Sequence, residues 1–175
     1  MNEKRDAYVR VAIAMSTAGT KDLNLTRAHS AYFLRGIIDW AEDGKRANLN
    51  VKKAPTTYRY SVKASALKHQ KSAYENRSKG DKEVKLHAEH VIPNIIVFNR
   101  FLKLIDDGPS TNLEGSAELE LSFFLEENCE IVIITKAEAE LLDSKLKLRE
   151  KMPWDWRWGD SRYARFEAAG IEIEW

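Results

Sequence analysis

Four consecutive β-branched residues, Ile131 to Ile134, constrain the fold of this chain more than any other feature of its sequence. Branching at Cβ favours extended backbone, and a run without polar alternation indicates a strand that is buried on both faces. Thr135 follows, and threonine is a favourable N-cap for a helix. We therefore predict a strand over Cys129 to Thr135 that leads directly into a helix.

The spacing of apolar residues elsewhere indicates further helices. They are predicted at about residues 2–16, 26–42, 94–105, 113–127, 135–151 and 161–168, and the basic segment 61–77 is also compatible with a helix. Alternating polarity predicts a short strand over about residues 83–91. The same alternation predicts an edge strand over residues 171–175, which is suited to pairing two copies in a homodimer.

The expected fold class is therefore α+β, a mainly helical single domain around a short β-hairpin followed by a helix. Residues 1–82 are expected to form a helical N-terminal part with a basic surface. Residues 83–175 are expected to hold the hairpin, its helix, and a C-terminal helix and strand. A chain of 175 residues is long enough to bury one core of this kind.

Cysteine content and apolar run length bear on the compartment. The one cysteine, Cys129, has no partner within the chain for a disulfide, which favours a reducing environment. Apolar runs are too short to span a bilayer, and the mixed charges of residues 1–6 are unlike a signal peptide. We expect a cytoplasmic protein that does not bind membranes.

Positive and negative charges are segregated along the chain. Residues 45–85 hold twelve lysines and arginines against three acids, whereas residues 104–135 hold eight acids and no base. Clustered cations favour a nucleic acid partner, with DNA as the first choice, although a basic surface docked on the acidic helix explains the same pattern. The residues expected to contact a nucleic acid backbone are Lys52, Lys53, Arg59, Lys63, Lys68, Lys71 and Arg77.

The segment His87 to Pro93 holds the residues best suited to catalysis. Glu89 and His90 lie near the end of the strand predicted over 83–91. A histidine titrates near neutral pH and can accept a proton from water, and a neighbouring carboxylate is a hard oxygen ligand for Mg²⁺ or Mn²⁺. A different interpretation stays open, in which His87 and His90 form a hydrogen-bonded structural pair.

The sequence Glu89-His90-Val91-Ile92-Pro93, followed later by Ile131 to Thr135 and a helix, resembles the ββα-metal module of HNH (His-Me finger) nucleases. The resemblance covers about residues 83–150, with a longer insertion between the two strands than is usual in that family. It implies that His90 is the general base and Glu89 a ligand of a divalent metal ion, Mg²⁺ or Mn²⁺. His87 would be a second ligand or a phosphate contact.

The helix departs from the family pattern at its metal-ligand position. The family commonly has histidine or asparagine four residues after the threonine, and this place is Ala139. Three acids stand nearby, Glu138, Glu140 and Asp143, and any of them could replace the missing ligand. Glu138 is preferred because Glu140 would project from a different face of the helix.

The leading hypothesis is a metal-dependent endonuclease that hydrolyses DNA phosphodiester bonds. A non-catalytic DNA-binding or regulatory protein is one alternative, and a protein-interaction module that uses the acidic helix is another.

Near the C-terminus, Trp154, Trp156 and Trp158 alternate with Asp155 and Arg157. Such a run either closes the core of the C-terminal part, which is the preferred interpretation, or binds bases and phosphates.

Overall fold

The computed structural model describes residues 7, 9–11, 14, 58–74, 81–108 and 116–175. The chain divides into two compact units, each built from two segments: residues 1–46 with 94–129, and residues 47–93 with 130–175. Within the described residues, no helix has the length and apolar character that crossing a bilayer requires. The mixture of helices and a small sheet confirms the α+β class.

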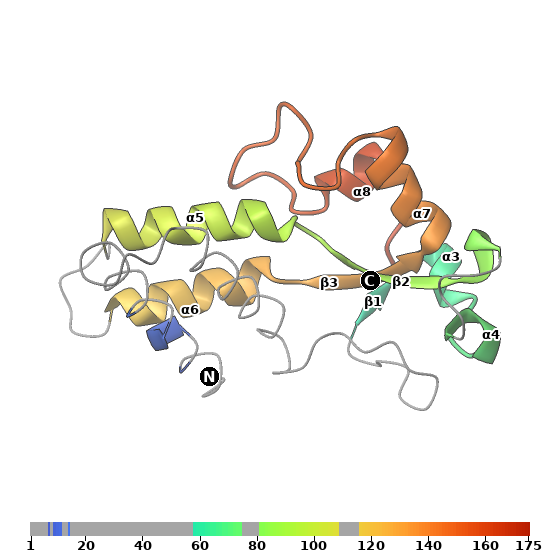
Figure 1. Cartoon of the computed structure of the whole chain (residues 1–175), viewed down its shortest axis with the longest axis horizontal. Helices are drawn as coiled ribbons and strands as arrows, with labels where there is room; N and C mark the ends of the chain where they lie inside the picture. Colours follow the sequence, from blue (N-terminus) through green and yellow to red (C-terminus); the bar gives the residue numbers. More distant parts are fainter. Residues whose placement is uncertain (1–6, 8, 12–13, 15–57, 75–80, 109–115) are drawn as a thin grey trace, which may run out of the picture. The chain divides into compact units, whose positions relative to one another are not determined.

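The second unit is built on a sheet whose described strands number three, in the order β1–β3–β2 (Figure 1). β3 (Ile131–Thr135) is central, antiparallel to β2 (Leu86–His90) and parallel to the short β1 (Arg59–Tyr60). All five residues of β3 are buried, which confirms the prediction from its β-branched run. In the β2–β3 register, Leu86 pairs with Thr135 and His90 pairs with Ile131.

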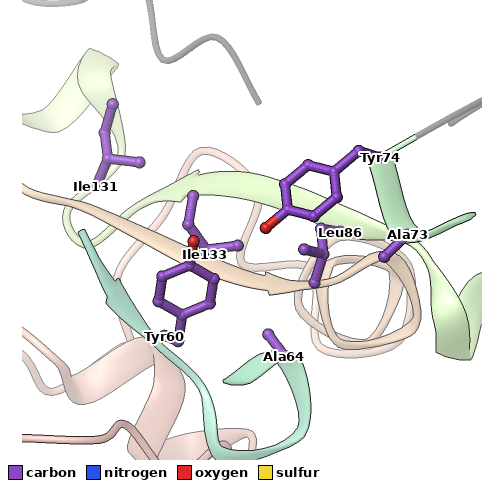
Figure 2. Close-up of a cluster of buried hydrophobic side chains, with 7 residues drawn as sticks. All are labelled: Tyr60, Ala64, Ala73, Tyr74, Leu86, Ile131 and Ile133. Carbon is purple, nitrogen blue, oxygen red and sulfur yellow. The ribbon is translucent and has the colours of Figure 1, made fainter. Parts of the chain in front are cut away.

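One face of this sheet packs into a hydrophobic cluster (Figure 2). Leu86 from β2 and Ile133 from β3 are 1% and 0% exposed. They meet side chains from β1, a strand of the same sheet, and from the two short helices that follow it, so those helices cover this face. The buried members of the cluster are Tyr60, Ala64, Ala73, Tyr74, Leu86, Ile131 and Ile133.

The basic segment forms two short helices, α3 (Val62–Ser65) and α4 (Lys71–Tyr74). The prediction of one continuous helix over 61–77 was therefore wrong for its described part. Helix α3 begins at Ser61, whose side chain accepts a hydrogen bond from the amide of Ala64. Burial of Ala64, Ala73 and Tyr74 against the sheet outweighs the weak local preference for a long exposed helix.

The helix after β3 is shorter than its sequence pattern indicates. Helix α7 (Lys136–Glu140) continues as a single wide π-helical turn, η2 (Leu141–Lys145), and stops there instead of at residue 151. The backbone of Lys147 is left-handed (φ 59°), and the amide of Leu148 donates to the carbonyl of Leu142 at 2.8 Å. This reversal satisfies the last carbonyls of the helix and ends it.

Other boundaries of the second unit also differ from the predictions. A 3₁₀ turn, η1 (Lys82–Val84), replaces the first part of the strand predicted over 83–91. Helix α8 spans Ala164–Ala168. The predicted edge strand 171–175 does not form, since Ile173 makes only an isolated bridge with Ser61. Sheet pairing depends on a partner strand, which alternating polarity alone does not supply.

The first unit contains helix α5 (Asn94–Asp107) and helix α6 (Ser116–Asn128), which pack against each other (Figure 1). They confirm the helices predicted at 94–105 and 113–127, of which residues 113–115 lie outside the described part. Ala7, residues 9–11 and Ala14 are helical, in agreement with the first predicted helix. The helix predicted over 26–42 lies outside the described residues.

Candidate functional site

Alternation along β2 sends its side chains to opposite faces of the sheet. Leu86 is buried in the hydrophobic cluster, and Ala88 packs against that cluster. His87 and Glu89 point the other way, and the His87 Nε2 atom lies 3.2 Å from the Glu89 Oε2 atom. The His87 side chain is 46% exposed and that of Glu89 only 14%, so Glu89 is the more buried member of the pair.

Arg165 of α8 is the main partner of Glu89. Its side chain is fully buried, and its Nη2 atom lies 3.0 Å from Glu89 Oε1. Its Nη1 atom donates to the backbone carbonyl of His90 at 3.0 Å. One guanidinium therefore fixes both the carboxylate and the end of β2. The sequence pattern groups Arg165 with the other arginines and aromatic residues near the C-terminus, but it gives no indication that Arg165 binds Glu89.

The ionised form of Glu89 is favoured in spite of its burial. Burial by itself raises the pKa of a carboxyl group. The hydrogen bond from His87 and the charges of Arg165 and His87 outweigh it, and the pKa of Glu89 lies below its ordinary value. Glu89 is thus an anion throughout the neutral range.

Asp143 lies in the π-helical turn η2, and its pKa is raised, whereas that of Glu89 is lowered. Burial raises its pKa, repulsion by Glu89 raises it further, and Arg149, Arg165 and His87 oppose these effects only in part. Its Oδ1 atom is buried and has no hydrogen-bond partner. Buried carboxylate oxygens are normally paired, and π-helical turns are frequent at functional sites. We call His87, Glu89, Asp143 and Arg165 the Glu89 cluster.

The two other acids of this helix are engaged elsewhere. Glu138, the predicted ligand, is buried and closes a capping box with Thr135, accepting from the Thr135 amide at 2.8 Å and from the Ser61 hydroxyl at 2.7 Å. Both carboxylate oxygens of Glu140 lie 2.6 Å from Lys82 Nζ. Of the three candidates named from the sequence, Asp143 is therefore the one brought to Glu89.

His90 occupies a different position from His87. It is the last residue of β2 and pairs with Ile131, so strict alternation places its side chain on the face opposite Glu89. The chain bends at Val91 and Ile92 directly after it, and the Val91 amide still donates to the Glu130 carbonyl at 2.9 Å. The sequence-predicted pair of Glu89 and His90 is thus held at the strand end, with the two side chains starting from opposite faces.

The residues expected to contact nucleic acid are distributed over several elements. Lys63 on α3 and Lys71 on α4 are exposed, and Lys68 between these helices is partly buried. Arg59 on β1 forms an ion pair with Glu130, with Nη1 3.2 Å from Oε1. The remaining three, Lys52, Lys53 and Arg77, lie outside the described residues.

The Glu89 cluster contains two carboxylates and one imidazole. Among the described residues, no group of three or more His, Cys, Asp or Glu side chains is placed so that it could hold a metal ion. Mg²⁺ usually takes only one or two protein carboxylates and completes its shell with water and phosphate oxygens. The unpartnered Oδ1 of Asp143 beside the anionic Glu89 fits this type of site.

Comparison of the chain with protein-family models, with curated proteins and with solved structures gave no match.

Proposed function

We propose that this chain is a metal-dependent endonuclease of the HNH-like type, which hydrolyses phosphodiester bonds of DNA. The proposal is carried by one observation, the pairing of Glu89 with His87 in a site where the charge of Glu89 also raises the pKa of Asp143. The order of elements, β2 antiparallel to β3 and then α7, supports the same assignment.

In this proposal Glu89 and Asp143 hold the cation. Their environments move the two pKa values in opposite directions, as is common where two acids share one functional site. A bound divalent cation supplies positive charge that stabilises the developing negative charge on the scissile phosphate. Arg165 keeps Glu89 ionised and fixes the orientation of its carboxylate, because the buried guanidinium binds one carboxylate oxygen.

We assign the general base to His90 and a positioning role to His87. The Nε2 atom of His87 contacts Glu89, and this contact orients the carboxylate. His90 pairs with Ile131 at the end of β2, so action as the base requires its imidazole to turn toward the Glu89 face at the bend that follows. A base at this place accepts the proton of the attacking water.

The test is cleavage of supercoiled plasmid DNA with Mg²⁺ or Mn²⁺, compared with a reaction that contains EDTA. His90→Ala is expected to lower the rate by about 10²–10⁴-fold. Asp143→Asn and Glu89→Gln are expected to abolish metal-dependent cleavage. Asp155→Asn, which removes an exposed acid of the same unit, serves as the matched control and should cleave normally.

Three results would change the assignment. Normal cleavage by His90→Ala together with loss in His87→Ala moves the base to His87. Normal cleavage by Asp143→Asn removes the carboxylate pair from the proposal. Salt-sensitive DNA binding without cleavage under any metal condition replaces the nuclease with a non-catalytic DNA-binding protein.

A further inference from the structure

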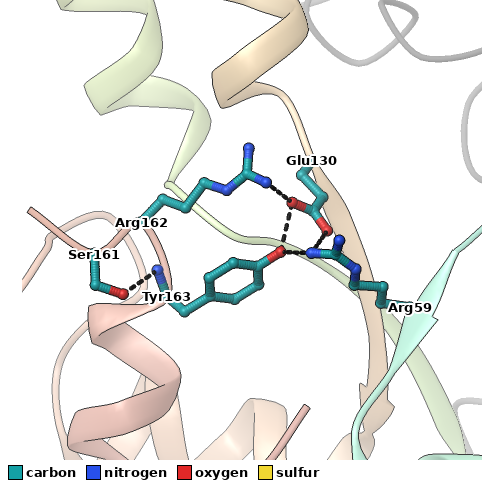
Figure 3. Close-up of polar contacts among 5 residues, drawn as sticks. All are labelled: Arg59, Glu130, Ser161, Arg162 and Tyr163. Atoms are coloured by element: carbon teal, nitrogen blue, oxygen red, sulfur yellow. Dashed lines mark hydrogen bonds and ion pairs between the residues drawn. The ribbon is translucent and has the colours of Figure 1, made fainter. Parts of the chain in front are cut away.

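A second group of charged and aromatic residues lies in the same unit as the Glu89 cluster (Figure 3). Glu130, just before β3, forms ion pairs with two arginines. Its Oε1 atom lies 3.2 Å from Arg59 Nη1, and its Oε2 atom lies 3.1 Å from Arg162 Nη2. The Tyr163 hydroxyl donates to Glu130 Oε2 at 2.6 Å and accepts from Arg59. With Trp175, these residues form what we call the arginine–tryptophan cluster.

The two arginines of the cluster share one carboxylate, that of Glu130. The side chains of Arg59 and Arg162 are each 38% exposed, so both reach solvent. Burial and the Glu130 carboxylate raise the pKa of Tyr163 to about 12, so its hydroxyl stays protonated at neutral pH.

Trp175 adds an exposed aromatic surface that is held in place. Its residue is 83% exposed, yet the Arg59 guanidinium lies 4.4 Å from its ring centre. The ring of Tyr163 meets it edge to face at 5.0 Å. An ordered, accessible tryptophan beside guanidinium groups is the combination that stacks a base while its phosphate is bound.

Short connections join this cluster to the Glu89 cluster. Tyr163 and Arg165 are two residues apart, and Arg165 binds Glu89 and the carbonyl of His90. The backbone carbonyl of Glu130 accepts a hydrogen bond from the amide of Val91. The two clusters are therefore connected through α8 and through the backbone hydrogen bond between Val91 and Glu130.

We propose that Arg59, Arg162 and Trp175 form a nucleotide subsite for single-stranded DNA, in which the arginines bind a phosphate and Trp175 stacks on the adjacent base. Its placement next to a scissile phosphate rests on the proposed nuclease function. Its ability to bind single-stranded DNA does not, because binding needs neither metal nor cleavage.

The experiment measures binding of a fluorescein-labelled single-stranded octanucleotide by anisotropy, in EDTA, with the full chain. Trp175→Ala is expected to raise Kd by about tenfold, the usual effect of losing one stacked base. Phe123→Ala is the control, because Phe123 is 53% exposed and lies on α6, in the other unit; its Kd should not change.

The arginines are tested through the salt dependence of the same binding. Arg162→Gln is expected to reduce the slope of log Kd against log salt by the amount that one neutralised phosphate contributes, that is about 0.7 for a single strand. Lys151→Gln removes an equal charge from an exposed position and should leave the slope unchanged. Thermal unfolding of each variant verifies that the fold is retained.

Equal Kd values for Trp175→Ala and Phe123→Ala would overturn the subsite, whatever the plasmid assay shows. Tighter binding of the duplex form of the same octanucleotide would also overturn it, since a paired base is not available for stacking. Absence of plasmid cleavage with an intact tenfold effect of Trp175→Ala would reject the nuclease and leave the subsite standing.

Discussion

Glu89 and Asp143 illustrate how neighbouring acids acquire different properties from their surroundings. Glu89 has a buried guanidinium and an imidazole as partners, and its pKa is lowered. Asp143 faces that anion from a partly buried position, and its pKa is raised. Bringing a second carboxylate to this place costs stability, which is typical of residues retained for function.

Asp143→Asn is therefore expected to stabilise the metal-free protein while it abolishes cleavage. The change removes repulsion against Glu89 and the cost of burying a charge, so we expect the melting temperature at pH 7 to rise by about 2 °C. Differential scanning calorimetry in EDTA measures the effect. An unchanged or lower melting temperature would show that Asp143 is not in conflict with Glu89.

Glu89→Gln is expected to have the opposite effect on stability. It leaves the fully buried Arg165 without its carboxylate, a loss of about 3 kcal/mol in the free energy of unfolding at pH 7. Because the pKa of Glu89 is lowered in the folded state, the carboxylate stabilises the protein above its ordinary value of 4.5 and this contribution fades as pH falls below it. Chemical denaturation between pH 3 and 8 should show the difference between the two proteins shrinking at the acid end.

At the scale of elements, the junction of β3 and α7 links three parts of the second unit. Glu138 closes the capping box with Thr135 at the start of α7 and also binds Ser61, the N-cap of α3. Thr135 pairs with Leu86 across the β2–β3 ladder. A single buried carboxylate thus ties the helix carrying Asp143 to the sheet carrying Glu89, which sets the distance between the two acids.

Glu138→Ala is expected to destabilise the fold by about 2 kcal/mol, because it removes a helix cap and leaves the buried Ser61 hydroxyl without its acceptor. Glu140→Ala, in the same helix, removes an exposed ion pair with Lys82 and should change stability little. Urea denaturation of both variants provides the comparison. Equal effects would show that the Glu138 contacts do not hold the junction.

At the scale of the whole molecule, the basic region 45–85 offers a test of nucleic acid binding that is independent of catalysis. Lys63 and Lys71 lie exposed on α3 and α4, on the helices that cover one face of the sheet. The double variant Lys63→Gln/Lys71→Gln should reduce the slope of log affinity against log salt for duplex DNA by up to about 1.8, which is about 0.9 for each phosphate that is no longer neutralised. Lys103→Gln/Lys151→Gln removes the same charge and is the control; equal slopes would argue that net charge alone drives binding.

Local patterns in the sequence were sufficient for the elements that form the site. The β-branched run of β3, the threonine that caps α7 and the alternation of β2 depend on neighbours along the chain, and each was predicted at nearly its observed position. The choice of Glu89 as a candidate ligand came from the same segment. Backbone preferences and side-chain periodicity act over a few residues, so they can be recognised without the fold.

The partners of Glu89 depended on contacts that no local pattern encodes. Arg165 reaches it from 76 positions away, and Asp143 faces it because α7 is held at Ser61 and continues into a π-helical turn. The preference for Glu138 came from ideal helical geometry, whereas the capping box uses that carboxylate within the helix itself. Long-range packing decides which acid meets which cation, because burial and charge at a site arise from elements that meet only when the chain has folded.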